Sequence, residues 1–277
     1  MNGSAIRLFQ VAAYGWLAIY MIAMLFLGTA AWTNAPVDLF TTQSSLADFV
    51  QRRIDLLAEG NVIHLCIAAL LIALAQLRRH RWWLGLIAWL LFRIITHRTW
   101  LASNGGIQLM ENMLLWAAFV GTRSHGHMTT WSHAHMSLFA FWAARLQLLL
   151  AYAAAAAHKF TGTSWLDGTA MLRVVNDPLF HLGWLADFPR VCAMLTWLTL
   201  AWMSLFPFAV WWKWSRRVVL IIGVFFHLVT AIFMDIPQLG LAFIACYALW
   251  LKEEEAERVL GWFRAIVPKK EAPRPSA

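Results

Sequence analysis

Three polar side chains recur at intervals of seven residues along one apolar stretch of the sequence: Arg145, Tyr152 and Lys159. Seven residues of an α-helix turn through about 700°, almost two full turns, so the three side chains share one stripe of a helix. At about 1.5 Å per residue, Lys159 lies about 21 Å beyond Arg145, near the end of the stretch. Residues 153–157 are all alanine, and small residues let a neighbouring helix or a flat ligand approach closely.

Lys159 has two interpretations at this stage. In an apolar pocket, loss of hydration lowers the pKa of a lysine ammonium, and the free amine is then available as a base. At the end of a membrane helix, a lysine commonly extends its ammonium to the interface instead. The spacing alone favours the interfacial lysine.

Other ionisable residues also fall inside apolar stretches, where they are costly and by default indicate a functional site. They are Arg93, His97, Glu111 and His227. The alternative is internal pairing, for example of Arg93 or Arg145 with Glu111, which holds helices together and implies no chemistry.

Two His-x-His pairs precede the stripe, His125 with His127 and His133 with His135. Four imidazoles are suitable ligands for zinc, copper or nickel. No cysteine or carboxylate accompanies them, so we interpret them as interfacial histidines and expect no metal.

The loop after the stripe contains Asp167, His181 and Asp187. The carboxylates are candidate acids or substrate contacts, and His181 is a candidate neighbour of the lysine. Asp167 also precedes an apolar run, which favours a helix cap. The sequence contains no Gly-x-Ser-x-Gly, His-Glu-x-x-His or nucleotide-binding glycine motif.

The elements that must position these residues are apolar helices. Of the 277 residues, 61% are hydrophobic and only 13% are charged, whereas soluble proteins carry roughly 25% charged residues. A spanning helix needs about 20 mostly apolar residues. The sequence predicts an all-α, polytopic transmembrane bundle with about eight spans (seven to nine), at 8–31, 61–77, 83–101, 107–121, 134–157, 191–212, 218–233 and 236–251.

Lys and Arg in the short loops predict the orientation. The cations near residues 7, 78–81, 123, 213–217 and 269–270 fall on one side of an eight-span bundle, which the positive-inside rule assigns to the cytoplasm, together with both termini. The net charge of +8 is thereby explained without nucleic acid. Lys159 then lies at the extracytoplasmic edge.

We expect a transmembrane domain at 1–251, a cytoplasmic surface helix at 252–266 and a disordered tail at 267–277. An interfacial helix is predicted at 46–58. The three cysteines all fall in apolar segments and are interpreted as small buried hydrophobic residues. Many of the eighteen tryptophans fit interface belts and packing; the alternative is an aromatic cavity.

Three stretches resemble the vitamin K-dependent γ-carboxylase-like membrane domain, also called the HTTM domain. The first runs from Tyr152 through His158-Lys159-Phe160 to Gly162, Trp165, Asp167 and Gly168. The second runs from His97-Arg98 to Asn104-Gly105-Gly106, and the third contains His227-Leu228. Together they cover roughly residues 90–250, and the chain resembles a short, bacterial-type member of the family.

The resemblance implies that Lys159 is a base that deprotonates a reduced, vitamin K-like quinone at the extracytoplasmic face of a bacterial plasma membrane. It implies catalytic roles for Lys159, His158, Tyr152 and His227. It implies cofactor-binding roles for Arg98, Asn104, Arg145, Trp165, Asp167, Gly168 and His181. The resemblance implies an enzyme, either a carboxylase-like lyase or an oxidoreductase, that acts on a peptide or a small molecule.

The sequence also departs from the family pattern. The animal enzymes carry a large lumenal domain after the membrane core, with no counterpart after residue 251 here, so a peptide or protein partner subunit is expected in its place. His158 replaces the second lysine of the animal enzymes, and Ile107-Gln108 replaces an acidic residue after Gly-Gly. The alternatives are an accessory protein in the maturation or export of a secreted peptide, without catalysis of its own, and a polytopic scaffold or carrier.

Overall fold

The computed structural model describes residues 3–28, 61–98, 103–121, 131–180 and 182–266. All regular secondary structure within these ranges is helical, which confirms the prediction of an all-α protein. The interfacial helix expected at 46–58 and the tail at 267–277 lie outside the described residues.

Each of the eight predicted apolar segments contains one long helix. The long helices are α1 (Gly3–Ala23, continued by the π-helical turn η1, Met24–Gly28), α4 (Val62–Arg78), α5 (Trp82–Arg98), α6 (Gly105–Phe119), α7 (Trp131–Phe160), α10 (Pro189–Ala209), α11 (Lys213–Phe233) and α12 (Pro237–Tyr247, continued by η5, Ala248–Trp250). The shorter elements are α8 (Thr163–Leu166), α9 (Ala170–Val175), η4 (Gly183–Leu185) and α13 (Glu253–Ile266).

Four helical segments are long and apolar enough to cross a membrane: Gly3–Phe26, Ala134–Phe160, Pro189–Ala209 and Lys213–Phe233. Three further apolar helices are shorter, Val62–Arg78, Trp82–His97 and Pro237–Trp250. Large apolar side chains also cover outward faces; on α11 alone, Ile221, Phe225 and Ile232 are each at least 65% exposed. Apolar surface of this extent is typical of contact with lipid, so length and surface together indicate a membrane protein.

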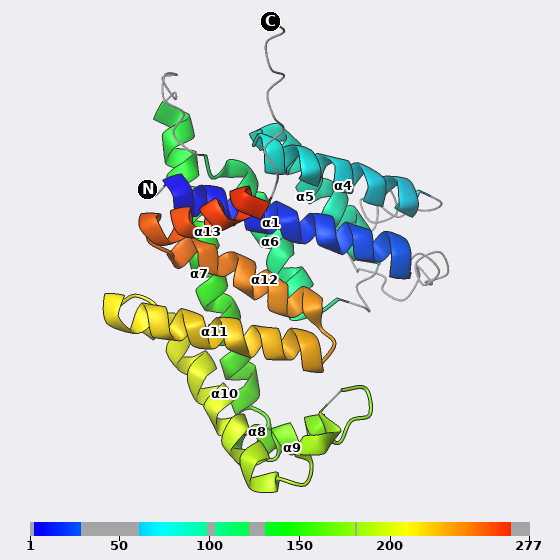
Figure 1. The fold of residues 1–277 in the computed structure, drawn as a ribbon, viewed down its shortest axis with the longest axis vertical. Coiled ribbons are helices and arrows are strands. Elements are labelled where there is room, and N and C mark those ends of the chain that lie inside the picture. Colours follow the sequence, from blue (N-terminus) through cyan, green and yellow to red (C-terminus); the bar gives the residue numbers. More distant parts are fainter. Residues whose placement is uncertain (1–2, 29–60, 99–102, 122–130, 181, 267–277) are drawn as a thin grey trace, which may run out of the picture.

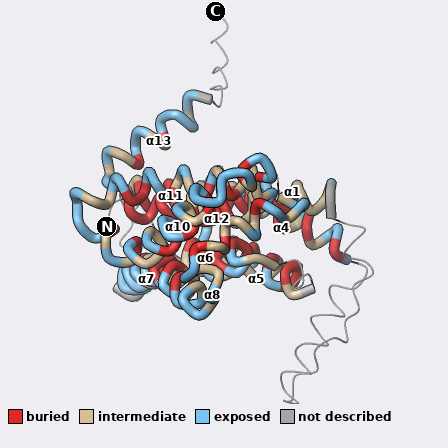
Figure 2. Tube along the Cα trace, turned by 90° about the horizontal axis from the view of Figure 1, so that it is seen from below, coloured by how far each residue is buried: buried red, intermediate tan, exposed pale blue. Residues whose placement is uncertain are grey.

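Helix α12 lies at the centre of the arrangement, in contact with α1, α6 and α11. Helices α4 and α5 cover α1 and α6 on one side, and α7 packs between α6 and α10 (Figure 1). The buried residues gather inside this body, whereas α13 extends away from it (Figure 2). Helix α13 stays attached through Ala256 and Leu260, which are buried on the side that packs against α1.

Arg7 caps the C-terminal end of α4, on the side where the basic loops lie. Arg7, in the first turns of α1, donates from Nη2 to the carbonyl of Leu77 at 2.5 Å and from Nη1 to the carbonyl of Gln76 at 3.5 Å. These carbonyls belong to the last turn of α4. Carbonyl groups in the last turn of a helix receive no hydrogen bond from within the helix and carry partial negative charge. One of the cations on the predicted cationic side therefore also caps a helix C-terminus.

Candidate functional site

Lys159 lies in the last turn of α7, on the same helix as Arg145 and Tyr152, as predicted; the helix ends at Phe160, three residues beyond the predicted span at 134–157. The backbone N–H of Gly162 donates to the carbonyl of Lys159 at 3.1 Å, and the N–H of Trp165 donates to the carbonyl of Gly162 at 3.1 Å. These turns reverse the chain and bring Trp165 of α8 back over the lysine. The Lys159 Nζ lies 4.8 Å from the centroid of the Trp165 ring.

The Lys159 amine is half-buried and has no hydrogen bond or ion pair to any residue that the structure describes. The face of an indole attracts a cation by its quadrupole. The position of the Lys159 Nζ over the Trp165 ring is therefore that of a cation–π contact.

Asp167, the acidic residue nearest in sequence to this lysine, is engaged by Thr169 instead. Its Oδ1 accepts hydrogen bonds from Thr169 Oγ1 at 2.6 Å and from the Thr169 N–H at 2.9 Å. These bonds hold the pKa of the Asp167 carboxyl below its usual range. Asp167 was expected to cap the following helix; it fixes the turn before α9, whose N-cap residue is Thr169.

Gly168 follows in a left-handed conformation, with φ at +82°. A Cβ atom at this position would lie 2.9 Å from Cζ2 of Trp197 on α10, so only glycine lets the turn pack this closely. The Trp197 Nε1–H donates to the carbonyl of Leu166 at 3.2 Å. Gly168 and the carbonyl of Leu166 therefore attach the turn that carries Trp165 to α10.

A second group lies deeper in the bundle and links three helices. The Tyr152 hydroxyl of α7 lies 2.7 Å from Nε2 of His227 on α11 and 2.5 Å from the hydroxyl of Tyr247 on α12. All three side chains are at most 3% exposed. His227 Nδ1 is buried and has no hydrogen-bond partner among the described residues. Aromatic rings surround the group: Trp202, Phe206, Phe226 and Phe243.

Tyr247 is the member that sequence reasoning missed. It belongs to an apolar segment in which a tyrosine is typical of packing or of an interface, so its residue type carried no signal. The residue type that could have indicated this contact is the glycine at position 223. A Cβ at Gly223 would lie 2.2 Å from the Tyr247 hydroxyl, so a larger residue would not fit there. Glycine on α11 is what lets this hydroxyl reach the centre of the bundle.

The predicted catalytic residues thus form two separate groups. Tyr152 and His227 are joined directly, and Lys159 is joined to Trp165, but seven residues of helix correspond to about 10.5 Å between Tyr152 and Lys159 along the axis. His158 is exposed.

Two predicted cofactor-binding residues make structural contacts. Arg145 donates from Nε and Nη2 to the carbonyl of Leu249 at 3.0 and 2.7 Å, and its guanidinium lies over the rings of Phe141 and Trp250. Asn104 caps α6, because its Oδ1 accepts from the backbone N–H groups of residues 106 and 107 at 2.9 and 3.2 Å. The side chain of Arg98 and all of His181 lie outside the described residues.

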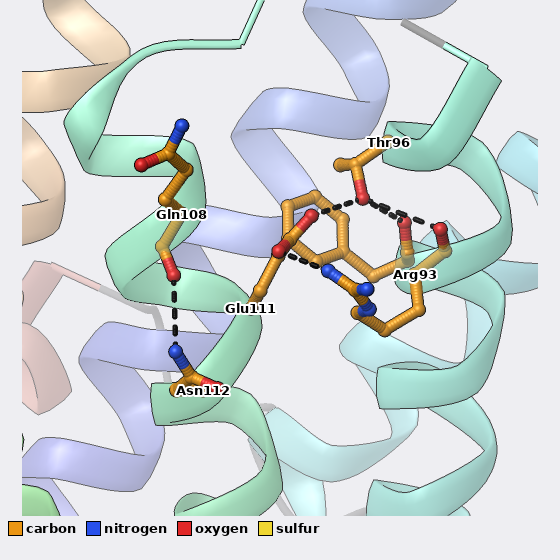
Figure 3. A network of polar contacts seen from close by, with 6 residues as sticks. Arg93, Thr96, Gln108, Glu111 and Asn112 are labelled. Carbon is orange, nitrogen blue, oxygen red and sulfur yellow. Dashed lines mark hydrogen bonds and ion pairs between the residues drawn. The ribbon is translucent and has the colours of Figure 1, made fainter. Parts of the chain in front are cut away.

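The internal ion pair expected for Glu111 is present and involves Arg93. Figure 3 shows the guanidinium of Arg93, from α5, paired with the carboxylate of Glu111, from α6. Thr96 Oγ1 donates to the other carboxylate oxygen at 2.5 Å. This confirms the interpretation of Arg93 and Glu111 as a pair between neighbouring helices.

The alternative of a metal site formed by four histidines falls mainly outside the described part of the chain. His125, His127 and the side chain of His133 are not described. His135 is exposed. Among the described side chains, no group of three or more histidines, cysteines or carboxylates is placed to hold a metal. Cys66, Cys192 and Cys246 are buried free thiols, as predicted.

Comparisons with protein-family models, with curated proteins and with solved structures found no match to this chain. The resemblance to the γ-carboxylase-like domain therefore stays a prediction from the residues quoted for it.

Proposed function

We propose that the chain is an integral membrane enzyme in which Lys159 accepts a proton from a lipid-soluble acid, such as a quinol, at the extracytoplasmic edge of the bilayer. The observation that carries the proposal is the half-buried amine of Lys159, which rests on the Trp165 ring without a carboxylate partner among the described residues.

The proposed topology has eight spans with both termini in the cytoplasm. One helix occupies each predicted segment, and the Lys and Arg side chains at the start of α1, the end of α4 and the start of α11 fall on one side of an alternating bundle. Cytoplasmic cations fit the positive-inside rule. The C-terminal end of α7, which carries Lys159, is then extracytoplasmic.

The carboxylate that would mark an ordinary interfacial ion pair is engaged elsewhere. Asp167 accepts two hydrogen bonds from Thr169, and a lysine held in an ion pair is a poorer base than one without a partner. The Trp165 ring stabilises the protonated product through its quadrupole.

A quinol fits this position by its chemistry, because it combines a flat apolar ring with a weakly acidic hydroxyl that supplies the proton. The Trp165 indole offers a face for the ring, and Lys159 accepts the proton at Nζ. Asp167 and Gly168 hold the turn that carries Trp165. Tyr152 and His227 are positioning residues, since they fix α7 against α11 from within the bundle.

The test is to purify the protein in its native lipids, extract it with organic solvent and identify bound quinone by mass spectrometry. We expect about one quinone per chain in the wild type and little in Lys159→Met or Trp165→Leu. Lys213→Met is the matched control, since Lys213 Nζ also lies over an indole, 5.3 Å from the ring of Trp214, at the start of α11. Equal quinone in all variants contradicts the proposal.

The accessory role predicts a different result. Co-purification of a secreted peptide with the wild type and with Lys159→Met alike, with no quinone in either, would replace the enzymatic proposal by a role in peptide maturation or export.

A further inference from the structure

One side of α6 is left exposed and carries two side-chain amides. Gln108 and Asn112 are both exposed, and Figure 3 shows them on the side of α6 away from Arg93. The side-chain amide of Gln108 makes no hydrogen bond to a described residue. The Asn112 amide makes one long bond, 3.5 Å from its Nδ2 to the backbone carbonyl of Gln108 in its own helix. Both amides therefore have donors and acceptors to spare.

In the proposed topology, these amides lie at the depth of the lipid chains. The 15 residues of α6 form a helix about 22 Å long, which fits within a hydrocarbon core of about 30 Å. Asn112 is the middle residue of this helix. Lipid chains offer an amide neither donors nor acceptors, so an exposed amide at this depth is costly unless another protein surface forms hydrogen bonds with it.

The exposed side of α6 has the residue spacing of a seam between two helices. Gly105, Gln108, Asn112, Leu115 and Phe119 follow one another at alternating intervals of three and four residues. The first three are exposed and the last two are partly exposed. This spacing keeps the five residues, the α6 stripe, against a partner helix along its whole length. The glycine lets the partner backbone approach closely at its end of the stripe.

A second copy of the chain fits the α6 stripe by symmetry. Two copies in one membrane have the same orientation, so a two-fold axis along the membrane normal makes their α6 helices parallel and in register. Asn112 then faces the partner's Asn112, and Gln108 faces the partner's Gln108. An amide has both N–H donors and an acceptor oxygen, so each pair is self-complementary. An asparagine in a parallel seam also fixes the register of the two helices.

The charges beside the stripe do not oppose this association. Glu111 is the sequence neighbour of Asn112, and two unpaired carboxylates would repel each other across the axis. Each Glu111 is neutralised within its own chain, because its carboxylate pairs with Arg93 and accepts a hydrogen bond from Thr96 (Figure 3). The stripe therefore presents amides and apolar side chains, which the same surface on a second copy can meet.

We propose that the α6 stripe is a homodimer interface within the membrane, held by amide pairs at residues 108 and 112. The proposal rests on the proposed course of α6 across the bilayer. It does not depend on the chemistry proposed for Lys159, which lies at the end of α7.

Disulfide trapping of the full chain in membranes tests the interface. Asn112→Cys places a thiol beside the two-fold axis, and oxidation with copper phenanthroline should convert the chain into a covalent dimer on a non-reducing gel. Phe225→Cys is the matched control, since Phe225 is 70% exposed near the middle of α11; it should stay monomeric. The three native cysteines are buried and are present in both variants. Equal trapping in both variants, or trapping of Asn112→Cys only to another protein or within one chain, overturns the proposal.

Energy transfer between fluorescently labelled chains in lipid vesicles measures the association itself. The wild type should dimerise, and Asn112→Leu should lower the association constant about tenfold, because an amide pair between membrane helices contributes about this factor. The substitution replaces an exposed polar side chain by an apolar one, so the unfolding temperature and the quinone content should stay at the wild-type level. A monomeric wild type, or full association of the Asn112→Leu, Gln108→Leu double variant, overturns the interface and leaves the role of Lys159 to its own test.

Discussion

Replacing Tyr152 by phenylalanine removes the one hydroxyl that joins three helices. The substitution keeps the ring among its aromatic neighbours and leaves His227 Nε2 and the Tyr247 hydroxyl without the partner that lies 2.7 and 2.5 Å away. Both of these groups are at most 3% exposed, so water does not replace the lost hydroxyl.

The expected cost follows from the two stranded groups. Leaving one buried polar group unsatisfied costs about 1–3 kcal/mol, so Tyr152→Phe, which strands two, should destabilise the protein by about 2–6 kcal/mol. At about 2–4 °C per kcal/mol for a chain of this size, the unfolding temperature should fall by roughly 4–24 °C.

The control is Tyr247→Phe, which removes the end of the chain of hydrogen bonds and leaves Tyr152 bonded to His227. Its cost should be about 1 kcal/mol. Adding Tyr247→Phe to Tyr152→Phe should cost less than Tyr247→Phe alone, because it deletes a hydroxyl that is already stranded. The assay is thermal unfolding in detergent, followed by intrinsic fluorescence. Equal losses for the two single variants, or strict additivity in the double variant, would refute the network.

Three further predictions concern the described helix ends. Gly106→Ala should destabilise the protein strongly in a thermal unfolding assay, since its Cβ would lie 2.3 Å from the Cα of Leu239; a wild-type unfolding temperature would contradict that close approach. Asn104→Ala should cost about 1 kcal/mol and Asn104→Asp almost nothing, because the aspartate keeps the helix cap; similar losses in both would exclude capping. Burial and the charge of Arg7 lower the pKa of His80 to about 4, so stability should be full above pH 6.5 and fall as the pH drops from about 6.5 to about 4. His80→Gln should flatten that part of the pH profile, and an unchanged profile would contradict the assignment.

The sequence was sufficient to predict the helices. For several contacts it also identified one of the two residues involved. Apolar runs of spanning length predict α1, α7, α10 and α11 directly, because hydrophobicity and length decide which segments form such helices. Charge inside an apolar segment indicated that Arg93 and Glu111 would pair. The predicted span at 134–157 ends three residues before α7 does, because a span is assigned from apolar residues, whereas the polar His158 and Lys159 continue the helix, as the stripe of Arg145, Tyr152 and Lys159 requires.

The remaining contacts depend on information that residue types do not carry. The acceptor for Arg145 is the backbone carbonyl of Leu249, and a carbonyl is present at every residue. Tyr247 meets Tyr152 only because of how α12 packs beside α11 and α7, across 95 residues of sequence. Asn104 did carry a signal, because asparagine before a helix is typical of an N-cap, but the family resemblance favoured a cofactor role.

The central claim is that Lys159 takes a proton from a lipid-soluble acid, and a chromogenic naphthol tests it most directly. The naphtholate anion absorbs at longer wavelength than the neutral naphthol, so proton transfer to the protein is visible when the probe is added to purified protein below the pKa of the free probe. The account predicts the anion signal with the wild type and with Lys213→Met, and its loss with Lys159→Met. An anion signal of equal size in all three proteins, or none in the wild type, would contradict it.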